Sequence, residues 1–221
     1  MNIIINAGGN SDFNARLDLA KDMNVRAPRM LMELAEKCFK FEMFCQVSTL
    51  LAYSDRTGFI DEKMFESTHD WEADCKKIEQ THHSEIPKFT GEIIHGFPNV
   101  YSYTKRMAEE LLSKNAKVPL TIIRPSIVAA AYQEPFPGWT DSLGLLGRFY
   151  AVAGLGVMRD FPVNPKLISD QIPVDFVSNQ LLAAIPYFTW ESKKTGNLFF
   201  LTHACSSSSN GVTWGETVSA L

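Results

Sequence analysis

The fold is decided around one stretch, Phe97-Pro98-Asn99-Val100-Tyr101-Ser102-Tyr103-Thr104-Lys105-Arg106-Met107-Ala108-Glu109-Glu110. Pro98 and Asn99 predict the start of a helix, which continues to about residue 114. A spacing of four places the Tyr101 phenol and the Lys105 ammonium on one face of that helix. A neighbouring ammonium favours the phenolate, so the pair suits an enzyme that delivers a proton to an oxygen at neutral pH. The alternative is a pair of residues on a solvated helix, and the rest of the sequence decides between the two.

The composition is that of a globular protein with one sizeable core, or one core and a small appendage. The chain has 221 residues, of which 45% are hydrophobic and 21% charged, and its net charge of −4 gives no electrostatic case for nucleic acid. The four cysteines show no metal-ligand spacing, and we expect reduced thiols in an intracellular protein. No apolar run approaches the ~20 residues of a membrane span, and no signal peptide is visible.

Strand and helix patterns alternate along the chain. Short apolar runs predict strands at residues 3–5, 41–47, 119–123 and 197–201, and longer periodic runs predict helices at 16–38, 99–114, 175–188 and from 213 onward. The first helix is expected to bend near Asn24. Residues 54–97, with a helix at about 69–82, and residues 132–170 are interpreted as surface or substrate-side excursions. Alternation of this kind predicts crossover connections and a parallel sheet.

Three loops follow the predicted strands directly. They cover residues 6–10, 48–51 and 125–128, and the helix that carries Tyr101 runs between the second and third of these strands. In parallel sheets, ligands gather at the carboxyl ends of the strands. We therefore expect these loops and the start of the helix to surround one crevice.

Several short motifs occur together in one order. They are Asn6-Ala7-Gly8-Gly9-Asn10 with Phe13, Asn24-Val25, Val47-Ser48-Thr49, Pro98-Asn99-x-Tyr101-x-x-Thr104-Lys105, Ile123-Arg124-Pro125-Ser126-Ile127-Val128, Glu134-Pro135-Phe136-Pro137-Gly138-Trp139 and Ile172-Pro173-Val174-Asp175 with Asn179. In this order the chain resembles the extended short-chain dehydrogenase/reductase superfamily. More narrowly, it resembles the fatty acyl-CoA reductases, also called male-sterility proteins. Gly8 stands where that family has alanine, and Ala27 where it has glycine.

The resemblance implies a reductase mechanism for these residues. Tyr101 would be the general acid, Lys105 would lower its pKa and hydrogen-bond the nicotinamide ribose, and Thr49 or Ser48 would hydrogen-bond the reacting oxygen; the sequence does not decide which hydroxyl does so. The implied cofactor is NADPH and the implied substrate a long-chain fatty acyl-CoA, which is reduced to an aldehyde and then an alcohol. The implied cofactor-binding residues, besides Tyr101 and Lys105, are Asn6, Ala7 and Gly8 at the ribose and Pro125, Ser126 and Ile127 at the nicotinamide.

One part of the family pattern is missing. The segment Gly-x-Gly-x-x-Gly, which holds the pyrophosphate at a helix N-terminus, does not occur in this sequence. The resemblance therefore implies an incomplete Rossmann-like, doubly wound parallel sheet that lacks its first three strands and the glycine-rich loop. We expect residues 1–221 to form a single partial NAD(P)-binding reductase domain that binds NADPH poorly by itself.

Two other interpretations remain open. One is an extended short-chain dehydrogenase that acts on a sterol, a flavonoid or a nucleotide sugar, although the Pro-Phe-Pro-Gly-Trp segment argues against it. The other is a non-catalytic remnant that does not bind cofactor.

Asp175, after Pro173, is expected to be a helix N-cap. We expect an intracellular location, in the cytoplasm or at the periphery of an organelle membrane. The sequence indicates neither acyl chain length nor final product nor oligomeric state.

Overall fold

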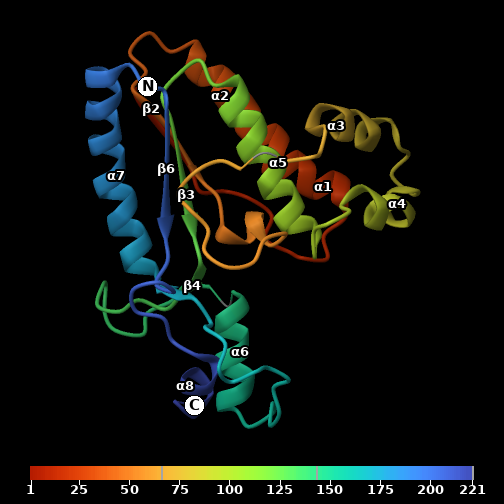
Figure 1. The fold of residues 1–221 in the computed structure, drawn as a ribbon, viewed down its shortest axis with the longest axis vertical. Coiled ribbons are helices and arrows are strands. Elements are labelled where there is room, and N and C mark those ends of the chain that lie inside the picture. The colour runs from red at the N-terminus through yellow and green to blue at the C-terminus, as the bar shows by residue number, and fades with distance from the viewer. Residues whose placement is uncertain (66, 143, 221) are drawn as a thin grey trace. The chain divides into compact units, whose positions relative to one another are not determined.

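A four-stranded sheet forms the centre of the first part of the molecule. The computed structural model describes residues 1–65, 67–142 and 144–220. Strand β1 (Ile3–Asn6) pairs in parallel with β2 (Met43–Val47), and β2 pairs in parallel with β3 (Leu120–Pro125). Strand β6 (Phe199–Ala204) lies beyond β3, so the order is β1-β2-β3-β6 (Figure 1). The predicted α/β class with parallel strands is confirmed.

The chain divides into two compact units. The first unit contains Met1–Arg124 and Ile185–Thr202, and the second contains Pro125–Ala184 and the residues from His203 onward. Helix α7 (Val174–Thr195) contributes to both. The other helices of the first unit are α1 (Leu17–Lys21), the π-helix η1 (Asp22–Arg26), α2 (Ala27–Glu36), the 3-10 helix η2 (Leu50–Tyr53), α3 (Trp71–Gln80), α4 (Ile86–Ile93) and α5 (Val100–Asn115).

The sheet of the first unit is covered on both faces. The last part of α7 lies on one face, where Phe188 stacks on Phe200 with ring centroids 4.8 Å apart, and α2 and α5 lie on the other (Figure 1). Each fully buried aliphatic side chain stabilises such a core by roughly 1.5–3 kcal/mol. The buried cluster between the sheet and the helices α2 and α5 consists of Ile4, Met32, Ala35, Phe44, Leu112, Leu120 and Ile122.

The predicted bend near Asn24 is confirmed as a π-helical turn. The turn η1 joins α1 to α2 without a loop. Its wider winding places Asn24 inside the molecule, where only 2% of the residue is exposed. The Asn24 amide Nδ2 donates to the Asn10 carbonyl and to Thr104 Oγ1, both at 2.9 Å. A buried amide with several partners accounts for the irregular turn, since an unpaired one is costly.

Helices α3 and α4 pack into the core. Trp71, Cys75 and Ile78 of α3 are buried in one cluster with Ile86 and Ile93 of α4 and with side chains of α1 and α5. The sequence analysis interpreted residues 54–97 as an excursion over the surface. Each of these helices carries a narrow apolar stripe, and the charged residues on its other faces make the segment polar on average. The stripe can be recognised only when the residues are compared at helical spacing.

The second unit contains a small sheet and two further helices. Strand β4 (Ile127–Ala129) pairs in parallel with β5 (Gln171–Pro173), and α8 (Trp214–Ser219) begins at a capping box made by Thr213 and Glu216. Helix α6 (Leu145–Gly154) lies within residues 132–170, where no helix was predicted. Among the described residues, no helix combines the length and the apolar character needed to cross a bilayer.

Asp175 has a different role from the predicted one. Helix α7 begins at Val174, so Asp175 already lies inside it. Its carboxylate accepts hydrogen bonds from the backbone N–H groups of residues 132, 133 and 134, at 3.0, 2.9 and 3.2 Å. These bonds hold the pKa of Asp175 at about 2, below its usual range. The predicted N-cap role is wrong because this side chain fixes a neighbouring loop instead.

Candidate functional site

The carboxyl ends of β1 and β2 form the edge at which the site lies. Asn6 ends β1, and its Nδ2 donates to Gln46 Oε1 at 2.9 Å. Lys105 extends from α5 to the end of β2, where its Nζ donates to the Val47 carbonyl at 3.1 Å. The predicted convergence is therefore confirmed for the loops after β1 and β2 and for α5.

Tyr101 lies in the first turn of α5. Asn99 caps this helix, since its side chain accepts a hydrogen bond from the Ser102 N–H at 2.8 Å. The ring of Phe13 stacks on the Tyr101 ring with centroids 5.8 Å apart and an interplanar angle of 28°. The Thr49 side chain hydrogen-bonds the Tyr101 phenol. Tyr101 thus contacts two segments that are distant from α5 in sequence, at Phe13 and at Thr49.

The electrostatic environment of Tyr101 differs from the one expected. Burial raises the pKa of Tyr101, and the hydrogen bond with Thr49 lowers it by less. The Lys105 Nζ lies 5.8 Å from the centroid of the Tyr101 ring and is directed at the Val47 carbonyl. The sequence predicts that Lys105 lowers the pKa of Tyr101, and this prediction is wrong for the structure, in which burial raises that pKa. The phenol retains its proton, which is the form that a proton donor needs.

Lys105 is buried, with 6% of the residue exposed. Burial lowers its pKa to about 8, and the negative charge of Glu109 opposes that shift. A lysine with a pKa near neutrality is typical of functional sites, although buried ion-pair networks produce the same effect.

Gly9 allows the loop after β1 to approach Lys105. A Cβ at Gly9 would lie 2.8 Å from Asn24 Oδ1 and 3.3 Å from Lys105 Nζ. Asn24 Oδ1 in turn accepts a hydrogen bond from the Asn10 N–H at 2.7 Å. The sequence analysis assigned no role to Gly9 or Asn24. The signals were present: a glycine pair directly after a strand and a polar residue at a helix bend.

The two candidate hydroxyls after β2 have different surroundings. Thr49 caps η2, where its Oγ1 accepts a hydrogen bond from the Leu51 N–H at 3.2 Å, and it also contacts Tyr101. Ser48 is 5% exposed, and its Oγ has no hydrogen-bond partner among the described residues. Thr49 is therefore the hydroxyl at the phenol, while Ser48 retains an unused donor at the same strand end.

The predicted cofactor-binding residues fall into two groups. Ala7 and Gly8 are exposed in the loop after Asn6, and they belong to the first unit, as do Lys105 and Tyr101. Pro125, Ser126 and Ile127 begin the second unit. There the Ser126 N–H donates to the Ala204 carbonyl at 2.9 Å, and Ser126 Oγ has no partner among the described residues.

These features fit a nicotinamide dinucleotide. The ammonium of Lys105 and the exposed loop at Ala7 and Gly8 provide a donor and a backbone segment open to a ligand at the carboxyl edge of a parallel sheet. The described residues contain no group of three or more histidine, cysteine, aspartate or glutamate side chains placed to hold a metal ion.

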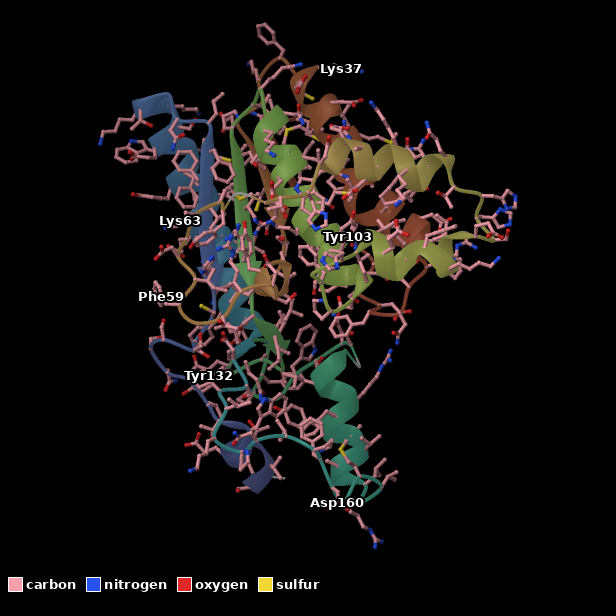
Figure 2. The ribbon with its side chains drawn as sticks, turned by 45° about the vertical axis from the view of Figure 1, so that its right-hand side comes forward. Lys37, Phe59, Lys63, Tyr103, Tyr132 and Asp160 are labelled. Carbon is pink, nitrogen blue, oxygen red and sulfur yellow. The ribbon has the colours of Figure 1, made fainter. Side chains whose placement is uncertain are left out.

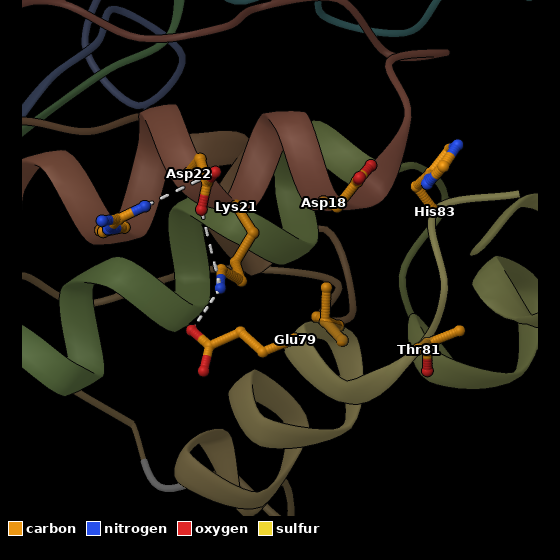
Figure 3. Close-up of a pocket in the computed structure, with 8 residues that line it drawn as sticks. Asp18, Lys21, Asp22, Glu79, Thr81 and His83 are labelled. Carbon is orange, nitrogen blue, oxygen red and sulfur yellow. Dashed lines mark hydrogen bonds and ion pairs between the residues drawn. The ribbon is translucent and has the colours of Figure 1, made fainter. Parts of the chain in front are cut away.

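A separate charged pocket lies where α1 and η1 face α3 (Figure 3). Its central group is Lys21, whose Nζ lies 2.6 Å from Glu79 Oε1 and 3.7 Å from Asp22 Oδ1. The Lys21 side chain is 4% exposed, and its charge is compensated by these neighbours. These ion pairs therefore link α1 and η1 to α3 and compensate the charge of Lys21. The lining residues are Asp18, Lys21, Asp22, Arg26, Ile78, Glu79, Thr81 and His83.

Comparison with known proteins identifies relatives among reductases. Fatty acyl-CoA reductase 1 of Homo sapiens is 34% identical over 217 residues, which cover 97% of this chain. Fatty acyl-CoA reductase 2, chloroplastic, of Arabidopsis thaliana is 34% identical over 212 residues and 84% of this chain. The chain spans 41% of the length of the human relative and 34% of the plant relative.

Solved structures share the fold at low identity. The Bordetella bronchiseptica enzyme WbmG in complex with NAD gives a TM-score of 0.62 at 12% identity, over 99% of this chain and 54% of that one. RMD from Pseudomonas aeruginosa, complexed with NADPH, gives a TM-score of 0.55 at 16% identity, over 99% of this chain and 64% of that one. A family model for NAD-binding domains, described as male sterility protein, matches residues 1–181. With most of its length matched by that model and a Rossmann-like parallel sheet in its structure, the chain belongs to the male sterility protein family.

Proposed function

We propose that this chain forms part of a fatty acyl-CoA reductase that uses NADPH to reduce a long-chain acyl-CoA thioester to a fatty aldehyde and then to an alcohol. The observation that carries the proposal is the meeting of the Tyr101 phenol, the Thr49 hydroxyl and the Lys105 ammonium at the carboxyl edge of a parallel sheet. The names of the relatives supply the substrate class.

Each of the three residues has a distinct task in this proposal. Tyr101 donates its phenolic proton to the carbonyl oxygen of the substrate while carbon accepts hydride. Thr49 hydrogen-bonds that oxygen and stabilises the negative charge that develops on it. Lys105 hydrogen-bonds the ribose of the cofactor and so orients it beside Tyr101. The bound nicotinamide supplies the hydride itself.

Tyr101 supplies one proton in each of two successive reductions. In the first reduction, hydride adds to the thioester carbon, the proton from Tyr101 neutralises the oxygen, and loss of the CoA thiol gives the aldehyde. In the second reduction, hydride from a second NADPH adds to the aldehyde carbon, and a proton from the same phenol completes the alcohol. The phenolate regains its proton from solvent between the two steps.

Two sets of residues are suited to contact the cofactor. Asn6 at the end of β1, with Ala7 and Gly8 after it, would contact a ribose, and Pro125 at the end of β3, with Ser126 and Ile127 after it, would line a nicotinamide pocket. The sequence contains no Gly-x-Gly-x-x-Gly segment for the pyrophosphate. We accordingly propose that this polypeptide by itself binds NADPH only weakly, which calorimetric titration measures directly.

The same proposal covers the domain and its location. We treat residues 1–221 as part of a single NAD(P)-binding reductase domain, with residues 132–170 on the substrate side. We place the protein inside the cell, in the cytoplasm or at the periphery of an organelle membrane.

A product assay tests the proposed reaction. The chain, and a chimera in which it replaces the matching 217 residues of the human relative, are incubated with palmitoyl-CoA and either NADPH or NADH. We expect release of the CoA thiol and formation of hexadecanal and hexadecanol in the chimera, faster with NADPH. Turnover of a sterol, a flavonoid or a nucleotide sugar without turnover of palmitoyl-CoA would indicate another short-chain dehydrogenase. A well-folded chimera that is inactive on all of these substrates would indicate a non-catalytic remnant.

A further inference from the structure

A buried cluster of charges lies beyond Lys105 on α5 and is not used in the proposed reaction. Glu109 and Arg124 are both fully buried, and Arg124 Nη2 lies 2.7 Å from Glu109 Oε2. Arg124 Nε also donates to both Glu109 oxygens, at 3.0 and 3.1 Å. The remaining guanidinium contacts include the Lys63 carbonyl at 3.1 Å and the Tyr53 hydroxyl at 2.5 Å. These bonds fix the Glu109 carboxylate in one position.

A second pair beside the first offers an internal comparison. Arg106 Nε donates to Glu110 Oε1 at 2.7 Å, and these side chains are also buried. The guanidinium carbons of Arg106 and Arg124 lie 3.8 and 4.0 Å from the centroid of the Tyr53 ring. Glu109 and Glu110 are therefore adjacent carboxylates with the same kind of partner and similar burial.

The two carboxylates differ in their relation to Lys105. Glu109 follows Lys105 by four residues and shares its face of α5, whereas Glu110 follows by five and is turned away. Burial depresses the pKa of Lys105, and Glu109 is the charged group whose attraction raises it.

Among the described residues, the other groups found near Lys105 carry no formal charge. They are the Tyr101 ring of α5, the Val47 carbonyl of β2 and Gly9 of the loop after β1, with the Asn24 amide of η1 on the other side of Gly9. Charge compensation for the buried ammonium therefore depends on α5 itself, one turn further along.

We propose that Glu109 is a positioning residue whose carboxylate, held by Arg124 and one helical turn from Lys105, keeps the buried Lys105 amine protonated while it bonds the Val47 carbonyl. The role of that charge in the reaction rests on the proposed function, in which the Lys105 ammonium hydrogen-bonds the cofactor ribose beside Tyr101. The charge state itself depends only on the arrangement of Lys105, Glu109 and Arg124.

Titration of Lys105 in the intact chain tests the proposal without substrate or cofactor. Lysine labelled with 13C at Cε is followed by NMR from pH 6 to 11, and the Lys105 signal is assigned by its loss in Lys105→Arg. We expect a midpoint near 8 in the unmodified chain. In Glu109→Gln we expect it to fall by about one pH unit or more, since an opposite charge at close range shifts a pKa by roughly 1–3 units. Glu110→Gln is the matched control and leaves the midpoint within about 0.3 of its original value.

Equal shifts in the two glutamine variants, or no shift in Glu109→Gln, would overturn the proposal. Where Glu109→Gln alone does not fold, the variant Glu109→Gln/Arg124→Gln is compared with Arg124→Gln. The Lys105 midpoint should be lower in Glu109→Gln/Arg124→Gln than in Arg124→Gln, because only Arg124→Gln retains the Glu109 carboxylate. The expected titration together with full activity of Tyr101→Phe would refute the proposed function and leave the role of Glu109 intact.

Discussion

Replacing Lys105 by methionine should stabilise the protein at neutral pH, although the same change removes a group that the proposed reaction needs. The fold lowers the pKa of Lys105 from 10.5 to about 8. Since one pH unit corresponds to about 1.4 kcal/mol, holding this ammonium in the folded state costs about 3 kcal/mol at pH 7. Methionine has a similar length and no charge. The substitution also removes the hydrogen bond to the Val47 carbonyl, which costs about 1 kcal/mol. We therefore expect the free energy of unfolding to rise by about 2 kcal/mol.

The gain has a defined pH dependence. Below pH 8 the lysine is protonated in both the folded and the unfolded chain, and the cost of burying its charge is fully present. Between about 8 and 10.5 the folded chain releases the proton while the unfolded chain retains it, so the stability of the unmodified protein rises with pH. Above about 10.5 the cost is absent. The advantage of Lys105→Met should therefore shrink across this window.

Urea unfolding followed by circular dichroism at pH 7 and at pH 10 measures this difference. Lys77→Met is the matched control, because Lys77 is half exposed and pairs with Glu92 on the surface. It should change stability little at either pH. Two results would refute the reasoning: Lys105→Met less stable than the unmodified chain at pH 7, or a difference between the two proteins that is the same at both values of pH.

Three further substitutions test separate contacts by urea or thermal unfolding. Arg124→Met leaves the Glu109 carboxylate buried without its partner and should lower the free energy of unfolding by about 3–5 kcal/mol. The double variant Arg124→Met/Glu109→Met should recover most of this loss, and additive losses in the two single variants would contradict the pairing. Asp175→Asn should destabilise the second unit above pH 4, where the bonds to residues 132–134 are present, and the difference should vanish as pH falls toward 2; a constant difference would exclude the carboxylate as the cause. Gly9→Ala places a methyl group 2.8 Å from Asn24 Oδ1 and should lower the free energy of unfolding by about 1–3 kcal/mol. The control Gly8→Ala, whose Cβ would lie 3.6 Å from the nearest atom, should change it little, and equal effects would contradict the close approach at Gly9.

Much of the architecture could be predicted because it depends on local patterns. The strand that became β1 is a short apolar run, and Asn99 caps α5 as its position before a helical stretch suggests. The meeting of Lys105 with the end of β2 follows from topology, since parallel strands end at a common edge. Motif order then supplied the family, which the family model confirms.

Features that depend on distances in three dimensions could not be predicted. The sequence does not distinguish Ser48 from Thr49, because only packing of η2 against α5 determines which hydroxyl contacts Tyr101. The predicted lowering of the Tyr101 pKa is wrong, because burial raises this pKa and the Lys105 ammonium is directed at the Val47 carbonyl. The role of Asp175 depends on a loop about 40 residues earlier in the chain. Buried partners such as these have no local signature in sequence.

The most direct test of the proposed mechanism compares two tyrosines on one helix. Tyr103 lies two residues after Tyr101, but its hydroxyl donates to Asp74 at 2.8 Å in the core between α5 and α3 (Figure 2). In the chimera with the human relative, kcat/KM for palmitoyl-CoA is measured for Tyr101→Phe and Tyr103→Phe. If the Tyr101 phenol is the proton donor, Tyr101→Phe loses roughly 100-fold or more and Tyr103→Phe much less. Full activity in Tyr101→Phe, or equal losses in the two variants, would contradict the account.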